Sequence, residues 1–411
     1  MNRILKAAST GEKYKVIVAM PSVPGFAGDL HAKSSVSALA VMNLQYKSIC
    51  RGGYSIMEAI EKAGVDPKKY IQFYNLRSYD RINKSETMSM IEKESGVSYE
   101  TARKEYDDLV CAGYQGGGGE RGTQATSHYD HYQQIASTKK PDQGAEYDTV
   151  SPCHMLDAPS LTSIGWTGSP ESELDGYVSE ELYIHTKCLI ADDCIAIVGS
   201  ANLNDRSQLG YHDSEIAVVI EDPTPVASKM DGKPFQASQF AASLRRQIFR
   251  KHLGLLPPQD CTSPDANFTP PGKDPNVYDW GSAPDLAVQD PLSPAFEELW
   301  ASSARRNTDI FERVFRPVPT NKVRTWEQYE AYYGQHFVGL KDHEGKIVQP
   351  PKYDYGHVFT EAFQGGVREV KELLSQVRGT LVEMPLDFLC NVETLVKEGL
   401  DYNAITAEIY T

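Results

Sequence analysis

The sequence predicts an α/β fold, and three observations support this class. A short β-branched run, Tyr14–Met20, ends at Pro21 and has the pattern of a buried strand. Apolar residues from Val36 to Ile49 recur at helical spacing. Tyr70–Asn75 then has the length and composition of a second strand. Strands that alternate with helices are typical of α/β proteins.

The rest of the chain continues this alternation around two irregular segments. Gly52 and Gly53 end the first helix, and Ser55 is a suitable cap for a second one. Residues 113–180, which contain the run Gly116–Gly119, predict a flexible surface insertion. A Pro-rich loop covers roughly 256–290, a helix is expected from about residue 294 to 307, and residues 367–387 combine a helix with a strand.

Composition excludes several classes of protein. The 411 residues are 40% hydrophobic and 24% charged, with a formal net charge of −15, so broad electrostatic binding to nucleic acid or anionic lipid is not expected. Seven cysteines, an odd number with no CxxC pair, indicate reduced intracellular thiols. No apolar run has the length of a spanning helix or the form of a signal peptide.

The chemistry-bearing residues are concentrated between residues 182 and 220. Leu182–Ile190 is predicted as one strand, which places His185 and Lys187 on the same side because side chains alternate. A turn containing Asp192 leads into a returning strand, and Gly199-Ser200-Ala-Asn202 follows it. Ser214–Ile220 is expected to be a further strand that carries Glu215.

These residue types suit cleavage of a phosphodiester. An imidazole such as His185 exchanges protons near neutral pH. Lys187, Ser200 and Asn202 supply a positive charge and neutral donors for the non-bridging phosphate oxygens. Glu215 is a candidate to hydrogen-bond the second nitrogen of His185. Asp192 is as well explained by a turn as by a catalytic role, and we therefore assign it a supporting part.

The pattern His-x-Lys-x4-Asp-x6-Gly-Ser-x-Asn resembles the signature motif of the phospholipase D superfamily. The continuation from Asn202 to Glu215 is similar to the eukaryotic, phosphatidylcholine-cleaving branch. Segments before and after the motif are also similar to that branch, particularly to its fungal members: Met20–Gly28, Tyr46–Gly53, Tyr70–Arg77, Met230–Lys233, Trp300–Phe315, Val382–Asp387 and Ile409–Thr411.

The resemblance implies one copy of the α/β/α sandwich that this family uses twice, with the chain supplying the second of two His-Lys half-sites. It implies that a histidine of the first copy attacks phosphorus, while His185 protonates the departing alcohol and then activates water or another alcohol. Neither a metal ion nor a cofactor is implied. The catalytic lobe would comprise residues 1–112, 181–255 and 291–411, interrupted by the 113–180 insertion and the 256–290 loop.

The same resemblance implies partners and a location. The partners would be a phospholipid membrane surface, the first half-site or a second copy of this one, and regulators such as phosphoinositides or small GTPases, but no nucleic acid. The protein would be cytoplasmic and peripheral at intracellular membranes. A lipid-degrading hydrolase of this kind produces phosphatidic acid.

A second half-site is not evident in the sequence. His31-Ala-Lys33 is the other His-x-Lys, but it lacks the following Asp and Gly-Ser-x-Asn, and we interpret it as a chance match. The chain is therefore expected to be a fragment or a truncated product. Two alternatives stay open: a homodimer with two identical motifs, acting as a phosphodiesterase or nuclease, and a lipid-binding remnant without turnover.

Other candidate sites have simpler interpretations. Cys188 and Cys194 are expected to be core thiols. Three histidines of the insertion suggest a metal site, but we expect solvated loop residues there: His128, His131 and His154. The segment Met88–Leu109 has the length of a helix-turn-helix, although its acidic second helix is unsuited to DNA.

Overall fold

The structure is a computed structural model, and it consists of two compact units, Met1–Asp80 with Val150–Thr411 and Arg81–Thr149. It describes residues 1–24, 29–32, 35–82, 86–114, 127–139, 151–156, 160–166, 168–257, 278–344 and 346–395. Some predictions therefore lie outside the described residues: the Gly116–Gly119 run, Lys33, most of the Pro-rich loop and the carboxyl-terminal Ile409–Thr411.

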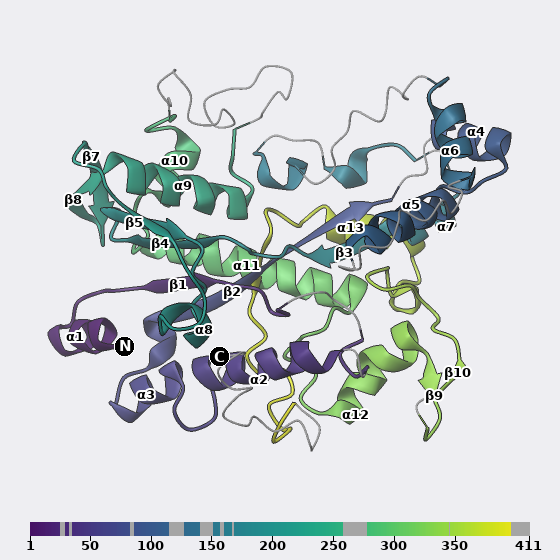
Figure 1. Ribbon diagram of the computed structural model, residues 1–411. Coiled ribbons are helices and arrows are strands. Elements are labelled where there is room, and N and C mark those ends of the chain that lie inside the picture. The colour runs from purple at the N-terminus through teal and green to yellow at the C-terminus, as the bar shows by residue number, and fades with distance from the viewer. Residues whose placement is uncertain are drawn as a thin grey trace. The chain divides into compact units, whose positions relative to one another are not determined.

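A sheet of four strands forms the centre of the first unit (Figure 1). The long strand β2, Ile71–Arg81, pairs in parallel with β1, Val16–Ala19, and antiparallel with β11, Leu381–Glu383. Strand β3, Tyr177–Glu181, also pairs with β2. The two strands predicted near residues 14–20 and 70–75 are thus confirmed, and the second is longer than predicted.

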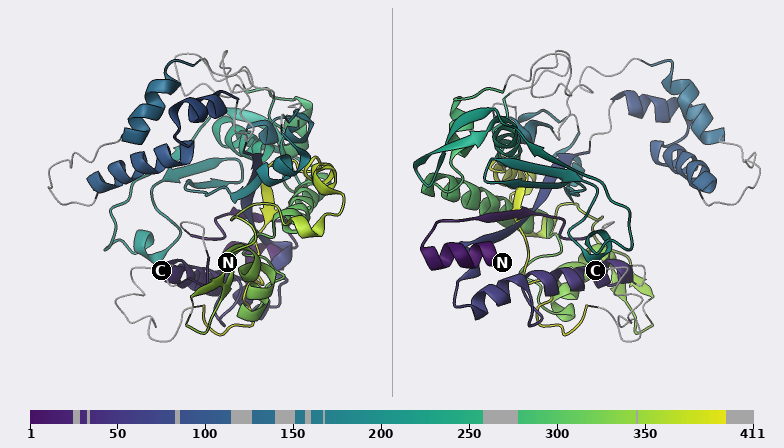
Figure 2. Two further views of the ribbon diagram at one scale, coloured as in Figure 1. Left: turned by 90° about the vertical axis from the view of Figure 1, so that its right-hand side faces the viewer. Right: turned by 60° about the vertical axis from the view of Figure 1, so that its left-hand side comes forward.

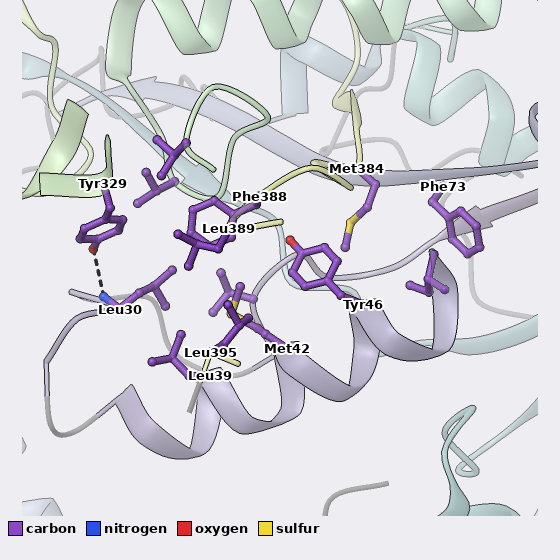
Figure 3. Close-up of a cluster of buried hydrophobic side chains, with 14 of the residues drawn as sticks. Leu30, Leu39, Met42, Tyr46, Phe73, Tyr329, Met384, Phe388, Leu389 and Leu395 are labelled. Atoms are coloured by element: carbon purple, nitrogen blue, oxygen red, sulfur yellow. Dashed lines mark hydrogen bonds between the residues drawn. The ribbon is translucent and has the colours of Figure 1, made fainter. Parts of the chain in front are cut away.

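One face of this sheet packs against helices α2, Val36–Ile49, and α3, Ile56–Lys62. Ile71 and Phe73 of β2 lie in one buried cluster with apolar residues of both helices and of the chain near residue 388, part of which is drawn in Figure 3. Ser55 caps helix α3, as predicted, and forms a reciprocal capping box with Glu58.

The opposite face packs against three other helices. Tyr74, which alternates with Phe73 along β2, lies in a second cluster with side chains of the helices α9, Gln239–Leu253, α10, Ala283–Gln289, and α11, Pro294–Phe315. Helices on both faces of a sheet make an α/β/α sandwich, which confirms the predicted fold class. Helix α11 is longer than the helix expected at 294–307 because its apolar stripe continues to Phe315.

A separate three-stranded antiparallel sheet carries the sequence motif. Its strands are β4, Lys187–Ala191, β5, Ile195–Gly199, and β6, Ala217–Glu221, in that order. Helix α9 lies against β4 and β5 (Figures 1 and 2). The short helix α8, Asp205–Gln208, lies in the connection between β5 and β6.

Smaller elements complete the first unit. They are α1 (Asn2–Thr10), α7 (Pro170–Gly176), the hairpin β7 (Pro225–Met230) with β8 (Lys233–Ser238), α12 (Trp326–Tyr329), a π-helix (Glu330–Val338), the pair β9 (Leu340–Lys341) and β10 (Ile347–Gln349), and α13 (Gly366–Leu374). A third cluster joins α11 and α13 with Tyr177 of β3.

The second unit contains three helices, α4 (Glu86–Ser95), α5 (Tyr99–Tyr114) and α6 (Ser127–Ala136). Ile91, Ala102 and Tyr132 belong to its own small core. The prediction that 113–180 is a flexible insertion is therefore wrong for the part that the structure describes. Helix α6 has apolar partners in α4 and α5, and α7 and β3 are integrated into the first unit.

No helix in the described part of the chain is long and apolar enough to cross a membrane.

Candidate active site

The register of the three-stranded sheet brings most of the predicted site residues to one end. Lys187, Gly199 and Ala217 are direct neighbours across β4, β5 and β6. His185 precedes Lys187, Ser200 follows Gly199, and Glu215 precedes Ala217. Antiparallel pairing therefore places these three residues beyond the same end of the sheet.

His185 lies in an irregular segment, not in a strand. Residues 182–186 have no strand structure, and β4 begins only at Lys187, so the prediction of one strand over Leu182–Ile190 is wrong in its first half. The reason is that β3 still pairs with β2 up to the Leu182 N–H, which donates to Leu76 O, whereas β4 pairs in another sheet. The segment that carries His185 passes between the two ladders.

The imidazole of His185 is exposed and lies beside one aromatic ring. The ring centroids of Tyr183 and His185 are 6.3 Å apart with an interplanar angle of 29°. Lys187 Nζ donates to the carbonyl oxygen of His185 over 2.6 Å. The lysine charge is thus anchored to the backbone of the histidine that it accompanies in the motif.

Ser200 and Glu215 form a second pair at this end of the sheet. The Ser200 hydroxyl donates to Glu215 Oε2, and Ser200 Oγ accepts from the Ile216 N–H over 3.0 Å. Hydrogen bonds from Ser200 and Ser207, with a smaller contribution from Lys187, hold the pKa of the Glu215 carboxyl below its usual range. The predicted bond from Glu215 to His185 is not among the hydrogen bonds of these described side chains; Glu215 instead fixes the Ser200 hydroxyl.

Asn202 lies in the loop that follows. Its side chain is exposed, and its carbonyl oxygen accepts from Gln208 Nε2 over 2.9 Å. Asn204 accepts from the Ser207 N–H at 3.0 Å, which caps the short helix α8. The loop is therefore held by its own hydrogen bonds, and the Asn202 amide is open to solvent.

Asp192 lies away from the other site residues. It occupies the β4–β5 turn with a φ of 49°, at the opposite end of β4 from Lys187. A five-residue strand places that turn roughly 15 Å from Lys187. The structure thus agrees with a turn residue here, and Asp192 does not meet His185 within this chain.

Its neighbour Asp193 has a structural role that the sequence analysis missed. Asp193 is 1% exposed and binds Arg245 of α9 through two hydrogen bonds of 2.5 and 2.7 Å. Arg246 and Arg250 of the same helix pair with Asp285 and Asp279. The available signal was that these three arginines recur at helical spacing on the same helix as Ala241, Ala242 and Leu253, because guanidinium groups on a buried helix face require carboxylate partners.

A second missed contact fixes the start of the His185 segment. Glu181, the last residue of β3, accepts from the Ser22 N–H at 2.5 Å and from the Ser22 hydroxyl at 2.8 Å. Burial raises the pKa of the Glu181 carboxyl, although Arg77 and the Ser22 donors oppose this shift. The contact connects the loop after β1 to the chain four residues before His185.

The sheet has no room for a side chain at Gly199. A Cβ atom on it would lie 2.6 Å from the Ile216 carbonyl oxygen and 2.9 Å from the Ala217 Cα. No side chain fits between β5 and β6 at this point. The glycine of the motif therefore permits the close approach that joins Ser200 to Glu215.

Two of the simpler interpretations need correction. Cys188 is exposed, not a core thiol, because it lies on the same uncovered sheet face as its cross-strand neighbours Val198 and Val218; Cys194 is half-buried. His128 and His131 lie on helix α6 instead of a loop. Among the described residues no group of three or more His, Cys, Asp or Glu side chains could hold a metal ion.

Comparison with known proteins agrees with the motif. The sequence profile of the family described as Phospholipase D matches residues 166–267, which include β4, β5, β6 and α9. Phospholipase D1 of Mus musculus is 27% identical over 412 residues, which covers 100% of this chain and 25% of that protein. Phospholipase D zeta 2 of Arabidopsis thaliana is 27% identical, over 96% of this chain and 26% of that protein. Phospholipase D of Phytophthora infestans is 28% identical, over 80% of this chain and 12% of that protein.

The chain is similar over its whole length to eukaryotic phospholipases D, and the similarity is to their C-terminal part. It spans about a quarter of the length of the mouse and Arabidopsis relatives that it matches.

Proposed function

We propose that this chain supplies the second half-site of a phospholipase D-type phosphodiesterase that converts phosphatidylcholine into phosphatidic acid and choline, or transfers the phosphatidyl group to an alcohol. The observation that carries the proposal is the convergence of His185, Lys187, Ser200 and Glu215 at one end of the β4–β5–β6 sheet. The similarity to phospholipases D supports the reaction class.

Each residue has a part in this reaction. A histidine of the first half-site attacks phosphorus, and the bond to the choline oxygen breaks as His185 gives that oxygen a proton. His185 then takes a proton from water as the water oxygen attacks phosphorus and the phosphorus–nitrogen bond to the first histidine breaks, which releases phosphatidic acid and restores that histidine. Lys187, Ser200 and Asn202 stabilise charge on the non-bridging oxygens. Asp192 would act only through the conformation of its turn.

The surface around the site supports the need for a second half. Several large apolar side chains are exposed on or beside the β4–β5–β6 sheet: Leu189, Val198, Leu203, Leu209, Tyr211, Ile216, Val218 and Val219. Large apolar side chains that remain exposed together on one sheet and its connections are typical of interaction sites. We propose that the first half-site, or a second copy of this chain, covers it, and that the assembled enzyme works at the cytoplasmic surface of intracellular membranes under lipid or GTPase regulation.

Choline release from phosphatidylcholine vesicles tests the proposal. The chain is assayed alone and mixed with the segment of a relative that precedes the matched region, with His185→Ala as the matched variant. We expect release in the mixture and a loss of about 10²–10⁴-fold on His185→Ala. Release that His185→Ala leaves unchanged, or no release in a mixture that forms a complex, would overturn the proposal.

Light scattering distinguishes the assemblies. A stable complex with the added half supports a split site, whereas an active dimer of the chain alone would replace it by the homodimeric alternative. Binding to vesicles without release in any combination would favour a non-catalytic remnant.

A further inference from the structure

Tyr183 is an exposed aromatic residue with no role in the steps described above. Its side chain is 52% exposed, and its ring is the aromatic ring next to His185 among the described residues. The two residues are separated by one position in an irregular segment, and their rings are only 29° from parallel. No hydrogen bond of the Tyr183 hydroxyl is present in the described structure.

We propose that the Tyr183 ring forms one wall of the subsite for the quaternary ammonium of the choline headgroup. This inference rests on the proposed function, because it uses His185 as the group that protonates the leaving oxygen. It adds a specificity-determining residue to that site.

The positions of the two rings match the length of choline. The leaving oxygen must come within about 3 Å of an imidazole nitrogen to receive its proton. Two methylene groups separate that oxygen from the trimethylammonium, so the cation has to lie close to the imidazole. The Tyr183 ring centroid is 6.3 Å from that of His185. A cation in this position is within reach of the Tyr183 ring face, since such contacts extend to about 6 Å from the centroid.

No lysine of the motif competes with a ligand cation for the Tyr183 ring. Lys187 is the nearest cation in sequence, but its Nζ is bound to the His185 carbonyl oxygen, and no Lys187 contact with the Tyr183 ring occurs in the part of the chain that the structure describes. Lys187 therefore does not compete for the Tyr183 ring, and Tyr183 is 52% exposed and accessible to a ligand. A quaternary ammonium is weakly hydrated and suits an aromatic wall better than a primary ammonium does.

Binding of soluble headgroups to the intact chain tests the inference without turnover. Phosphocholine and phosphoethanolamine are titrated separately, and ligand line broadening in NMR spectra gives the dissociation constants. We expect phosphocholine to bind more tightly, Tyr183→Leu to weaken its binding about three- to fivefold, and Tyr183→Phe to retain it. Tyr54→Leu is the matched control, because Tyr54 is also exposed but lies outside the site.

Circular dichroism and thermal unfolding establish that each variant folds. Equal phosphocholine binding by the parent chain and Tyr183→Leu would overturn the inference, as would equal binding of the two headgroups by the parent chain. The result is separable from the proposed function: unchanged choline release by His185→Ala would remove the reaction but leave the Tyr183 binding result in place. Release that depends on His185 without an effect of Tyr183→Leu on binding would remove the subsite alone.

Discussion

Strands β2 and β6 are both rich in apolar residues, but the fold buries one and exposes the other. Ile71, Phe73 and Tyr74 of β2 are at most 8% exposed, because helices cover both faces of their sheet. Val218 and Val219 of β6 are 56% and 58% exposed. Burial is what makes an apolar side chain stabilising. The central sheet therefore carries stability, whereas the motif sheet carries the candidate chemistry and leaves apolar side chains exposed.

The largest difference in stability is expected between two variants of the β4–β5 turn. Asp193→Asn removes the carboxylate from a buried pair with Arg245 and should lower the free energy of unfolding by about 3–5 kcal/mol. Asp192→Asn changes an exposed neighbour that also has a positive φ, and should stay within about 0.5 kcal/mol. Urea unfolding measures both values. Similar losses for the two variants would mean that the motif sheet is not anchored through Asp193.

A matched pair of apolar truncations addresses the two sheets directly. Leu381→Ala in β11 removes a fully buried side chain and should cost about 2–5 kcal/mol. Val219→Ala in β6 should cost less than about 0.5 kcal/mol in the isolated chain. Thermal unfolding followed by circular dichroism provides the comparison. If Val219→Ala were as costly as Leu381→Ala, β6 would be covered within this chain.

Glu181→Gln tests the cost of burying a charge at the junction of the two sheets. Burial raises the pKa of Glu181 above 4.5 in the folded state, so the stability associated with its proton is present below pH 4.5 and is lost as pH rises through the raised pKa. Glutamine has no charge to bury. We expect Glu181→Gln to be more stable than the parent at neutral pH and this advantage to shrink in acid. Urea midpoints across pH 4–8 measure the difference, and an advantage that grows in acid would contradict the assignment.

The smallest effect is expected at Ser200. Its hydroxyl is the first cause of the lowered pKa of Glu215, so Ser200→Ala should move that pKa back up towards 4.5. The stability due to this contact is present above the ordinary pKa and lost as pH falls through the lowered one. Carboxyl ¹³C chemical shifts report the titration. Thr at position 200 is the control that keeps the hydroxyl, and an unchanged Glu215 pKa in Ser200→Ala would show that the pair does not persist in solution.

The sequence predicted the central sandwich well because its signals are local. The helix Val36–Ile49 and the cap at Ser55 follow from apolar spacing and hydrogen-bonding side chains. The motif also contains residues that lie at one sheet end, His185, Lys187 and Ser200, whereas its Asp192 lies at the other end. By contrast, the break before Lys187 depends on which sheet each strand joins, a long-range choice that alternation in Leu182–Ile190 does not reveal. The Ser22–Glu181 contact joins residues 159 positions apart and has no pattern in the sequence.

The prediction that Cys188 is a core thiol was wrong for a different reason. Apolar alternation indicates that a strand has an apolar face, but not whether the same chain supplies the cover. The unit at 81–149 was misjudged because a Gly-rich run at 116–119 obscured the helices on both sides of it.

The crowding at Gly199 affects how a saturation library of this motif should be interpreted. Almost any replacement there pushes β5 away from β6 and disturbs the Ser200–Glu215 contact, so inactive clones will accumulate at a residue that donates nothing to phosphate. Screening for activity alone would rank this position with His185. Paired scoring of fold and turnover would separate a spacing requirement from a chemical one.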